Sequence, residues 1–338
     1  MDIASDNQDA QALVAAAEAE AEAAAEKLSR ARAEIGKAVF GQERVVELTL
    51  AAILAGGHVL LVGAPGLAKT RLVAAMAQVL GAPWGRVQFT PDLMPADIIG
   101  SEILDQDEAG KRKFRFVPGP IFTSLLMADE INRASPRTQS ALLQAMQEHQ
   151  VTVAGVAYPL PEPFHVLATQ NPIEHEGAYP LPEAQLDRFL LQVDVPYPDR
   201  ETERRIVIET TGLGESAPQT VLDPATLLSL QRLVRKMPVG DRVLAAILDL
   251  VRSARPGASA DPRVNAHVAW GPGPRAGQAL MLAVRARALL RGRLAPSVDD
   301  VAALARPALV HRMQLSFGAR GEGFDIDSLV DDLAEKAA

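Results

Sequence analysis

The chain reads Gly63-Ala64-Pro65-Gly66-Leu67-Ala68-Lys69-Thr70 directly after an apolar run, Val59 to Val62, and directly before a segment of helical composition, Arg71 to Ala77. A strand, a glycine-containing turn and a helix in this order form the context of a phosphate-binding loop. Glycine keeps side chains away from the anion, and the backbone N–H groups at the start of the helix then point at the phosphates. The stretch therefore predicts a loop that binds phosphate groups, with a chance connection between a strand and a helix as the alternative.

The residues of this loop have expected parts in such a site. We expect the ammonium group of Lys69 to reach the β- and γ-phosphates and the hydroxyl of Thr70 to ligate Mg²⁺. Ala68 departs from the usual pattern, which has glycine before the lysine. We expect that alanine still permits the approach of the phosphates, provided that its φ is negative. The other residues of the predicted ATP-binding loop are Gly63, Ala64, Pro65, Gly66, Leu67 and Arg71.

Composition sets bounds on the class of protein. The chain has 338 residues, of which 48% are hydrophobic, so it can bury a large core in one large or two medium domains. A net charge of −8 and an aromatic content of 4% disfavour a nucleic-acid surface. The absence of cysteine excludes disulfides, thiolate metal sites and a cysteine nucleophile. The chain shows neither a signal-peptide pattern nor an apolar run of membrane-spanning length, so we expect a cytoplasmic protein without a membrane span.

Residues 1–37 are predicted to form an N-terminal helix. Between Gln8 and Lys37 the chain is rich in Ala, Glu and Arg, a composition that favours helix. Acidic residues lie toward the start and basic residues toward the end, which suits the helix dipole. Because the polar residues are not mainly basic, we expect a solvated helix that packs loosely on the next domain rather than a membrane-surface helix.

Residues 38–196 alternate between apolar runs and helical segments, which is typical of a doubly wound α/β domain. Runs that are apolar throughout are expected of parallel strands covered on both faces, so we expect a five-stranded parallel sheet. The candidate strands are Val59–Val62, Val87–Phe89, Leu125–Ala128, Val166–Thr169 and Leu190–Val195, and the candidate helices are Arg44–Ala55, Arg71–Leu80 and Arg137–Gln150.

Two hairpin inserts are predicted in this domain. In residues 90–120, Ser101–Leu104 and Lys113–Phe116 predict a charged hairpin, and a second, shorter hairpin is predicted over residues 151–160. The first insert carries a basic cluster of Lys111, Arg112, Lys113 and Arg115. Such a cluster can contact nucleic-acid phosphates or an acidic partner, and on its own it is more simply a solvated hairpin tip.

The pattern changes after Pro196-Tyr197-Pro198, which predicts a hinge and a domain boundary. Residues 199–338 contain no clear strand, so we expect a small all-α domain. Its candidate helices are Glu201–Glu209, Thr226–Lys236, Val243–Arg255, Arg275–Arg291 and Ser297–His311.

Polar side chains come directly after two of the candidate strands. At the end of one strand, Asp129 can bind Mg²⁺ and Glu130 can polarise a water molecule for attack on a γ-phosphate. At the end of another, Asn171 can orient the same water without competing for the metal. Taken singly, the carboxylate pair is a solvated strand end and Asn171 is a turn former before Pro172. Together with the phosphate loop, they predict a site at which water attacks a γ-phosphate.

With these motifs the chain resembles the AAA+ ATPases and, within them, the MoxR family. The resemblance covers about Phe40 to His311, and its most specific part is Thr169 to Glu174 followed by Asp187-Arg188-Phe189. The other matching segments are Val39–Glu43, Gly63–Thr70, Ala128–Arg133, Ala168–Pro172, Leu181–Phe189 and Gly273–Ala276. The resemblance implies an AAA+ P-loop NTPase core with a five-stranded parallel sheet, followed by a small all-α lid domain that folds over the nucleotide. It also implies that the strand before Asn171 lies between those that carry the phosphate loop and Glu130.

The resemblance implies further site residues. Arg188 matches the arginine finger that reaches the nucleotide of a neighbouring subunit, and Arg275 matches the second sensor at the start of a lid helix. From the residues alone, an ion pair with Asp187 is the simpler role for Arg188, and helix capping or solvation is the simpler role for Arg275. Ordinary core packing is the alternative for the three residues that match the adenine-pocket segment, which are Val39, Phe40 and Gly41.

The family implies an ATP-hydrolysing ring, expected to be a hexamer, with ATP and Mg²⁺ as cofactors. Its members remodel or mature a protein client in the manner of chaperones, in part by metal-cofactor insertion and with a partner that carries a von Willebrand factor A domain. Two alternatives stay open. One is a scaffold whose nucleotide-bound state, rather than turnover, recruits a partner. The other is a nucleic-acid motor, which the acidic balance and the few aromatic residues disfavour.

Overall fold

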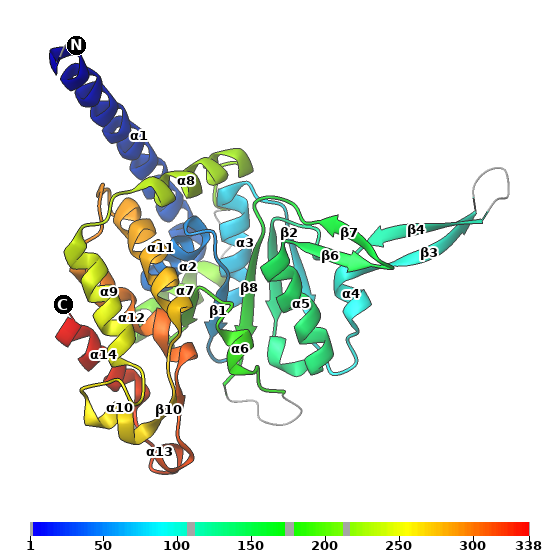
Figure 1. Cartoon of the computed structure of the whole chain (residues 1–338). Helices are drawn as coiled ribbons and strands as arrows, with labels where there is room; N and C mark the ends of the chain where they lie inside the picture. Colours follow the sequence, from blue (N-terminus) through cyan, green and yellow to red (C-terminus); the bar gives the residue numbers. More distant parts are fainter. Residues whose placement is uncertain (1–2, 107–111, 173–178, 212–216, 338) are drawn as a thin grey trace.

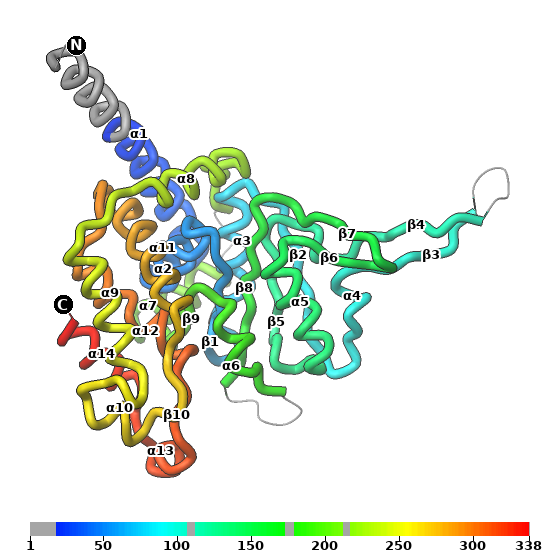
Figure 2. Tube along the Cα trace, in the orientation of Figure 1, coloured from blue at the N-terminus to red at the C-terminus, as the bar shows by residue number. Residues whose placement is uncertain are grey.

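The computed structural model describes residues 3–106, 112–172, 179–211 and 217–337, with side chains from residue 18 onward (Figure 1, Figure 2). Lys111 of the predicted basic cluster and Ile173–Glu174 of the MoxR-like segment lie outside these residues. Two parts follow one another along the chain. The first is a sheet with its helices and hairpins, and the second is mainly helical.

A parallel sheet of five strands forms the centre of the first part, in the order β2-β5-β8-β1-β9. The predicted five-stranded parallel sheet is thereby confirmed, and so is the prediction that β8, before Asn171, lies between β5 and β1. Because all the strands are parallel, their carboxyl ends meet at one edge of the sheet. The strands span Trp84–Gln88 (β2), Leu125–Asp129 (β5), His165–Gln170 (β8), Val59–Val62 (β1) and Leu191–Asp194 (β9).

Alternate side chains of the strands enter two hydrophobic cores, one on each face of the sheet. In β5, Leu125 and Met127 belong to one core, and Leu126 and Ala128 belong to the other. Helices α2 (Glu43–Leu54) and α3 (Lys69–Leu80) contribute to the first core, and α5 (Pro136–Glu148) contributes to the second. The strands are therefore apolar throughout because both of their faces are covered.

Helix α1 (Ile3–Ala38) packs tightly over its second half, which corrects the expected loose packing. Its buried side chains recur every three or four residues, a spacing that places them on one face of a helix, and they join the core of α2 and α3. They are Ala21, Ala24, Leu28, Ala31, Ile35 and Ala38. Most of these residues are alanines. In the sequence, this buried face is therefore hard to distinguish from the alanines on the solvated face of the same helix.

The second part is mainly helical, as predicted, with one small addition. Strand β10 (Val268–Trp270) pairs antiparallel with β11 (Gln314–Leu315). Strands of three and two residues are too short to show an alternating pattern in the sequence. The helices are α7 (Arg200–Thr211), α8 (Pro224–Lys236), α9 (Asp241–Ser253), α10 (Pro262–His267), α11 (Pro274–Leu290), α12 (Val298–Leu309), α13 (Phe317–Gly321) and α14 (Ile326–Ala337), with a 3₁₀ turn, η2, at Val310–Arg312. Over the described ranges, no helix is both long enough and apolar enough to cross a membrane.

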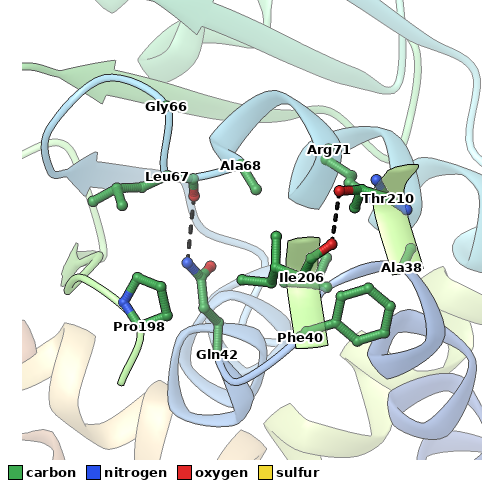
Figure 3. A pocket seen from close by; sticks show the side chains of 11 residues that line it. Ala38, Phe40, Gln42, Gly66, Leu67, Ala68, Arg71, Pro198, Ile206 and Thr210 are labelled. Carbon is green, nitrogen blue, oxygen red and sulfur yellow. Dashed lines mark hydrogen bonds between the residues drawn. The ribbon is translucent and has the colours of Figure 1, made fainter. Parts of the chain in front are cut away.

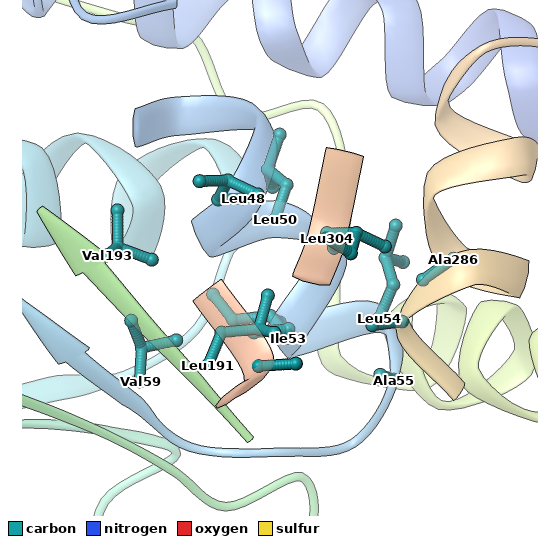
Figure 4. Packing of buried hydrophobic residues seen from close by; sticks show 14 of the residues in the cluster. Leu48, Leu50, Ile53, Leu54, Ala55, Val59, Leu191, Val193, Ala286 and Leu304 are labelled. Carbon is teal, nitrogen blue, oxygen red and sulfur yellow. The ribbon is translucent and has the colours of Figure 1, made fainter. Parts of the chain in front are cut away.

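The helical part shares one core with the sheet. Figure 4 shows α2 between Leu191 and Val193 of β9 on one side and Ala286 of α11 and Leu304 of α12 on the other. Helix α7 differs from these helices, because none of its described residues is buried. The sheet and most of the helical part therefore form one packed body, on which α7 is the more loosely held element.

A network of ion pairs reinforces the contact between α2 and the helical part. Glu47 of α2 pairs with Arg287 (3.1 Å) and Arg291 (3.0 Å) of α11. The fully buried carboxylate of Asp300, on α12, pairs with Arg287 and with Arg293 (2.6 Å). Each carboxylate has at least two guanidinium partners, which offsets the cost of removing its charge from water.

Two β-hairpins extend from the first part. Strand β3 (Gly100–Gln106) pairs with β4 (Arg112–Pro118), and β6 (Gln150–Val153) pairs with β7 (Val156–Pro159). The short helix α4 (Pro95–Ile99) leads into the first hairpin, which projects away from the sheet in Figure 1. The hairpins meet where the ring of Phe116 stacks on that of Tyr158, with 4.0 Å between the ring centroids.

Candidate active site

The predicted phosphate loop, residues 63–70, joins β1 to α3. At Gly63 an added Cβ would stand 2.8 Å from the carbonyl oxygen of Val195, so only glycine fits without a shift. Gly66 has a φ of 81°, which glycine adopts without strain. Ala68 has a φ of 55°, so the condition of a negative φ, on which the expected approach of the phosphates depended, is not met. The residue holds the left-handed conformation because the chain turns here into the first turn of α3.

Lys69 begins α3, and its side chain folds back onto the loop. The ammonium group donates hydrogen bonds to the carbonyl oxygens of Gly63 (2.6 Å) and Ala64 (3.2 Å). A positive charge is therefore held at the N-terminus of α3, where the helix dipole is also positive. Both features favour an anion at this place.

A cavity of about 440 Å³ separates the loop from the carboxyl edge of the sheet. The structure brings together here the residues that were predicted to bind phosphate, to hold a metal ion and to activate water, although they come from three segments far apart in the chain. These are Lys69, Thr70, Asp129, Glu130 and Asn171. The other residues of the wall are Pro65, Gly66, Leu67, Ala68, Arg71, Arg86 and Thr169.

Asp129, the last residue of β5, accepts hydrogen bonds at both carboxylate oxygens. Arg86 of β2 donates to Oδ2 from Nη2 (2.6 Å) and from Nε (3.1 Å), and the hydroxyl of Thr169 on β8 donates to Oδ1 (2.6 Å). These bonds fix the carboxylate between the two neighbouring strands. Asp129 and Thr70 offer carboxylate and hydroxyl oxygens beside the phosphate loop, which is the donor type that Mg²⁺ prefers, so the residues present fit a Mg²⁺–nucleotide complex.

Glu130 follows the strand with a φ of 55°. Its backbone N–H donates to the hydroxyl of Thr169 (2.8 Å), and its Oε2 accepts from Gln88 (2.7 Å) and Arg133 (3.0 Å). A left-handed conformation is strained for a residue with a side chain, and strain of this kind persists only where the surroundings hold it. The three hydrogen bonds provide such a hold on both the backbone and the carboxylate.

Three residues around the carboxylates were not predicted from the sequence. Arg86 and Gln88 lie two residues apart on one face of β2, and a hydrogen bond of 2.8 Å joins their side chains. Thr169 is fully buried and connects Asp129 to the backbone of Glu130. Polar residues with a spacing of two beside an acidic strand would have indicated Arg86 and Gln88. Thr169 ends an apolar run and carries no comparable signal.

A second cavity, of about 100 Å³, lies next to the phosphate loop (Figure 3). It shares part of the loop with the first cavity, and α7 forms another of its walls through Ile206 and Thr210. Val39 and Phe40, which match the adenine-pocket segment, line it, whereas Gly41 lines a neighbouring cavity. The remaining residues of its wall are Ala38, Gln42, Gly66, Leu67, Ala68, Arg71 and Pro198.

Arg188 and Arg275 lie together, away from the phosphate loop. The N–H of Leu190 donates to the carbonyl oxygen of His58 (2.8 Å), so the segment that carries Arg188 is level with the beginning of β1, whereas the loop follows its end. Four strand residues separate the two levels by about 13 Å. Arg275 contacts Asp187 at 3.5 Å, and burial together with the charge of Arg275 lowers the pKa of Arg188.

Arg312 holds the backbone on both sides of Arg188. Its guanidinium group is 1% exposed and donates to Oδ1 of Asp187 (2.7 Å). It also donates to the carbonyl oxygens of Asp187 (3.3 Å), Phe189 (2.6 Å) and Leu190 (3.2 Å). No sequence prediction covered Arg312, because an arginine that binds backbone carbonyls has no short motif.

Comparisons with known proteins identify the family. The model of the ATPase family associated with various cellular activities (AAA) matches residues 58–191, and that of the AAA lid domain matches residues 260–333. The chain is 41% identical over 314 residues to Chaperone MoxR1 of Mycobacterium tuberculosis. The aligned residues cover 92% of this chain and 82% of that protein. The chain belongs to the MoxR family of AAA+ ATPases. The predicted family is thereby confirmed.

Further relatives agree with this assignment. Protein MoxR of Paracoccus denitrificans is 34% identical over 303 residues, or 85% of this chain and 88% of that protein. The crystal structure of a candidate ATPase from Cytophaga hutchinsonii matches with a TM-score of 0.87 at 34% identity, over 96% of this chain and 98% of that one. The AAA+ fold with a helical lid is thus shown for this MoxR-family chain. The residues of the larger cavity all fall within the stretch that the AAA family model matches.

Proposed function

We propose that this MoxR-family protein binds ATP with Mg²⁺ and hydrolyses it to ADP and phosphate. The observation that carries this proposal is the single cavity that gathers Lys69, Thr70, Asp129, Glu130 and Asn171. Groups that attract phosphate lie on its loop side, and carboxylates lie on its sheet side. Phosphoryl transfer to water depends mainly on positioning and on charge stabilisation, which such an arrangement can supply.

Each side chain has a proposed part in cleaving the bond between the β- and γ-phosphates. Lys69 and the N–H groups of the loop bind the phosphates. Thr70 and Asp129 would hold Mg²⁺, which supplies positive charge against the phosphate oxygens. Glu130 accepts the proton of the attacking water, and the amide of Asn171 orients that water. The water oxygen bonds to the γ-phosphorus as the bond to the bridging oxygen breaks, which leaves ADP and inorganic phosphate.

We propose that Arg188 and Arg275 act on the nucleotide of a neighbouring copy, in a hexameric ring. The offset between the segment of Arg188 and the phosphate loop of the same chain argues against action within one chain. Two guanidinium groups side by side attract the charge that develops on a γ-phosphate. Helix α7 contributes Ile206 and Thr210 to the wall of the smaller cavity beside the phosphate loop, so we propose that α7 is the part of the lid that covers the nucleotide.

For the biological role we propose ATP-driven, chaperone-like remodelling of a protein client. The name of Chaperone MoxR1 supports such a role in a relative. The hairpin β3–β4 carries exposed apolar side chains, among them Ile103, Leu104 and Phe114, which a client can contact. A partner with a von Willebrand factor A domain, a part in metal-cofactor insertion and a cytoplasmic location stay predictions.

Phosphate release from ATP and Mg²⁺ by the purified protein tests the proposed hydrolysis. Lys69→Ala should lose nucleotide binding, and Glu130→Gln should keep it while turnover falls about 100-fold or more. The matched control is Glu322→Gln, because Glu322 is an exposed glutamate outside both cavities. Unchanged hydrolysis by Glu130→Gln would contradict the role of this residue.

Two further outcomes separate the alternatives. If client function survives in Glu130→Gln, the bound state rather than turnover is what the partner needs, and the scaffold explanation holds. If DNA strongly stimulates hydrolysis in a salt-dependent manner, the protein is a nucleic-acid motor.

A further inference from the structure

Gln42 places an unpartnered buried oxygen beside the smaller cavity. It precedes α2, is 7% exposed, and its Nε2 donates to the carbonyl oxygen of Leu67 in the phosphate loop (3.3 Å). Because a carbonyl oxygen can only accept, the amide nitrogen must face Leu67 and the amide oxygen must face away. Figure 3 shows this Oε1 turned toward Ile206. Among the side chains that the structure describes, Oε1 of Gln42 is one of the few buried polar atoms that lack a hydrogen-bond partner.

The cavity next to this oxygen has the character of a base-binding slot. Its walls include the apolar side chains of Val39, Leu67, Pro198 and Ile206. The phosphate loop separates it from the larger cavity, and the two cavities share a wall made of Gly66, Leu67 and Ala68 of the loop and Arg71 of α3. A nucleotide with its phosphates at Lys69 therefore has this slot within reach of its base.

The slot is narrow, and α7 is the part of its wall that can move outward. A cavity of about 100 Å³ is tight for a purine. None of the described residues of α7 is buried. One contact between α7 and the segment before α2 is made by the guanidinium group of Arg205, which lies over the ring of Phe40 at 4.6 Å from its centroid. A base can thus enter by moving α7 outward, without disturbing the core that holds Gln42.

We infer that Gln42 reads the 6-position of the base and selects a 6-aminopurine. The oxygen lies against Ile206, which is part of the α7 wall, so outward movement of α7 would expose it to the base; it can only accept a hydrogen bond, and the 6-amino group of adenine donates one. A 6-oxo purine such as guanine presents an acceptor at the same place, which would leave two buried oxygens facing each other without a proton. This inference rests on the proposed nucleotide binding and adds the residue that sets base specificity. Sites that hydrogen-bond a substrate group discriminate strongly against analogues that lack it.

The test compares the binding of three diphosphates in the presence of Mg²⁺: ADP, GDP and purine riboside 5′-diphosphate, which carries hydrogen at position 6. We expect the wild-type protein to bind ADP about tenfold tighter than purine riboside 5′-diphosphate and to bind GDP most weakly. Gln42→Met keeps the size of the side chain but removes the oxygen. This variant should lose ADP affinity until the ratio of ADP to purine riboside 5′-diphosphate approaches one.

The control is Gln192→Met, because Gln192 lines a cavity together with Gln42 but does not line the base slot. It should keep the wild-type ratio. If Gln42→Met weakens ADP and purine riboside 5′-diphosphate equally, Gln42 only supports the loop through Leu67, and the inference is overturned. If Gln42→Met does not fold, the wild-type series still decides, since equal affinities for ADP and purine riboside 5′-diphosphate overturn it as well. A wild-type protein that binds none of the three would instead refute the proposed nucleotide site.

Discussion

Replacing Ala68 with glycine should stabilise the protein. The φ of 55° and ψ of 23° place Ala68 in the left-handed region, which costs an L-residue about 1–2 kcal/mol and costs glycine almost nothing. Glycine also gives the unfolded chain more freedom, which removes about 0.4–1 kcal/mol of stability. Ala68 is exposed, so loss of its methyl group leaves no cavity. The free energy of unfolding should therefore rise by about 0.5–1 kcal/mol.

Ala154 provides a matched control for this substitution. It is an exposed alanine with a φ of 49°, in the turn between β6 and β7 and outside both cavities. Ala154→Gly should stabilise the protein by a similar amount. Ala68→Gly should also leave the affinity for ADP within about twofold of wild type, because the loop already holds the strained conformation in this structure and the strain is present before and after binding.

Urea denaturation followed by circular dichroism measures both effects on stability, provided that the slopes of the transitions agree among the variants. A gain for Ala154→Gly without a gain for Ala68→Gly would refute the argument that Ala68 is strained. An increase of about fivefold in ADP affinity, the equivalent of about 1 kcal/mol, would show instead that the loop takes this conformation only when nucleotide binds.

Buried histidines and the proposed ring give two further predictions. Burial lowers the pKa of His58 to about 3 and that of His165 to about 4, whereas both titrate near 6.5 in the unfolded chain. Between these values the unfolded chain binds protons that the folded chain does not, so stability is full above pH 6.5 and should fall by about 2 kcal/mol per histidine from pH 7 to pH 5. Urea denaturation across this range measures the fall, and a flat profile in both wild type and His165→Gln would contradict it. Separately, mixing Lys69→Ala with Arg188→Ala subunits should recover ATP hydrolysis that each lacks alone, because some sites then combine an intact loop with an intact arginine. Absence of recovery in rings shown to contain both subunits counts against an arginine that acts in trans.

The strands that lie inside the sheet could be predicted, because burial on both faces imposes a continuous apolar run. Leu125–Ala128 is such a run, and its prediction missed only Asp129, the last residue of β5. The edge strand β2 is different, since it begins at Trp84 rather than at the predicted Val87 and exposes most of its residues. An edge strand needs apolar side chains on one face alone, so its polar residues resemble those of a loop. The buried stripe of α1 escaped prediction for a related reason, because it is made mostly of alanine and resembles a solvated helix face.

The candidate site was predictable where a residue's position along the chain determines its place in space. Asp129 and Asn171 lie at or just after the end of a strand, and Lys69 ends the loop that follows β1; parallel strands bring their last residues to the same edge of the sheet. Arg86 and Gln88 contact the carboxylates from the neighbouring strand β2, so their spacing of two points to the site only once the strand order places β2 beside β5.

The proposed catalytic groups lie at opposite ends of the sheet, so a complete site would combine groups from two copies of the chain. The loop and the carboxylates lie at the carboxyl edge, and Arg188 lies level with the amino end of β1, fixed there by the buried guanidinium group of Arg312. A parallel sheet cannot bend to bring its two ends together, and the core shared with the helical part leaves α7 as the more loosely packed cover. On the proposed mechanism, a single chain would bind a nucleotide and still lack the positive charge of Arg188, which a neighbour would supply. On this argument hydrolysis should depend steeply on protein concentration in the range where the ring assembles, whereas ADP binding should not, and equal concentration dependence of the two would count against the division.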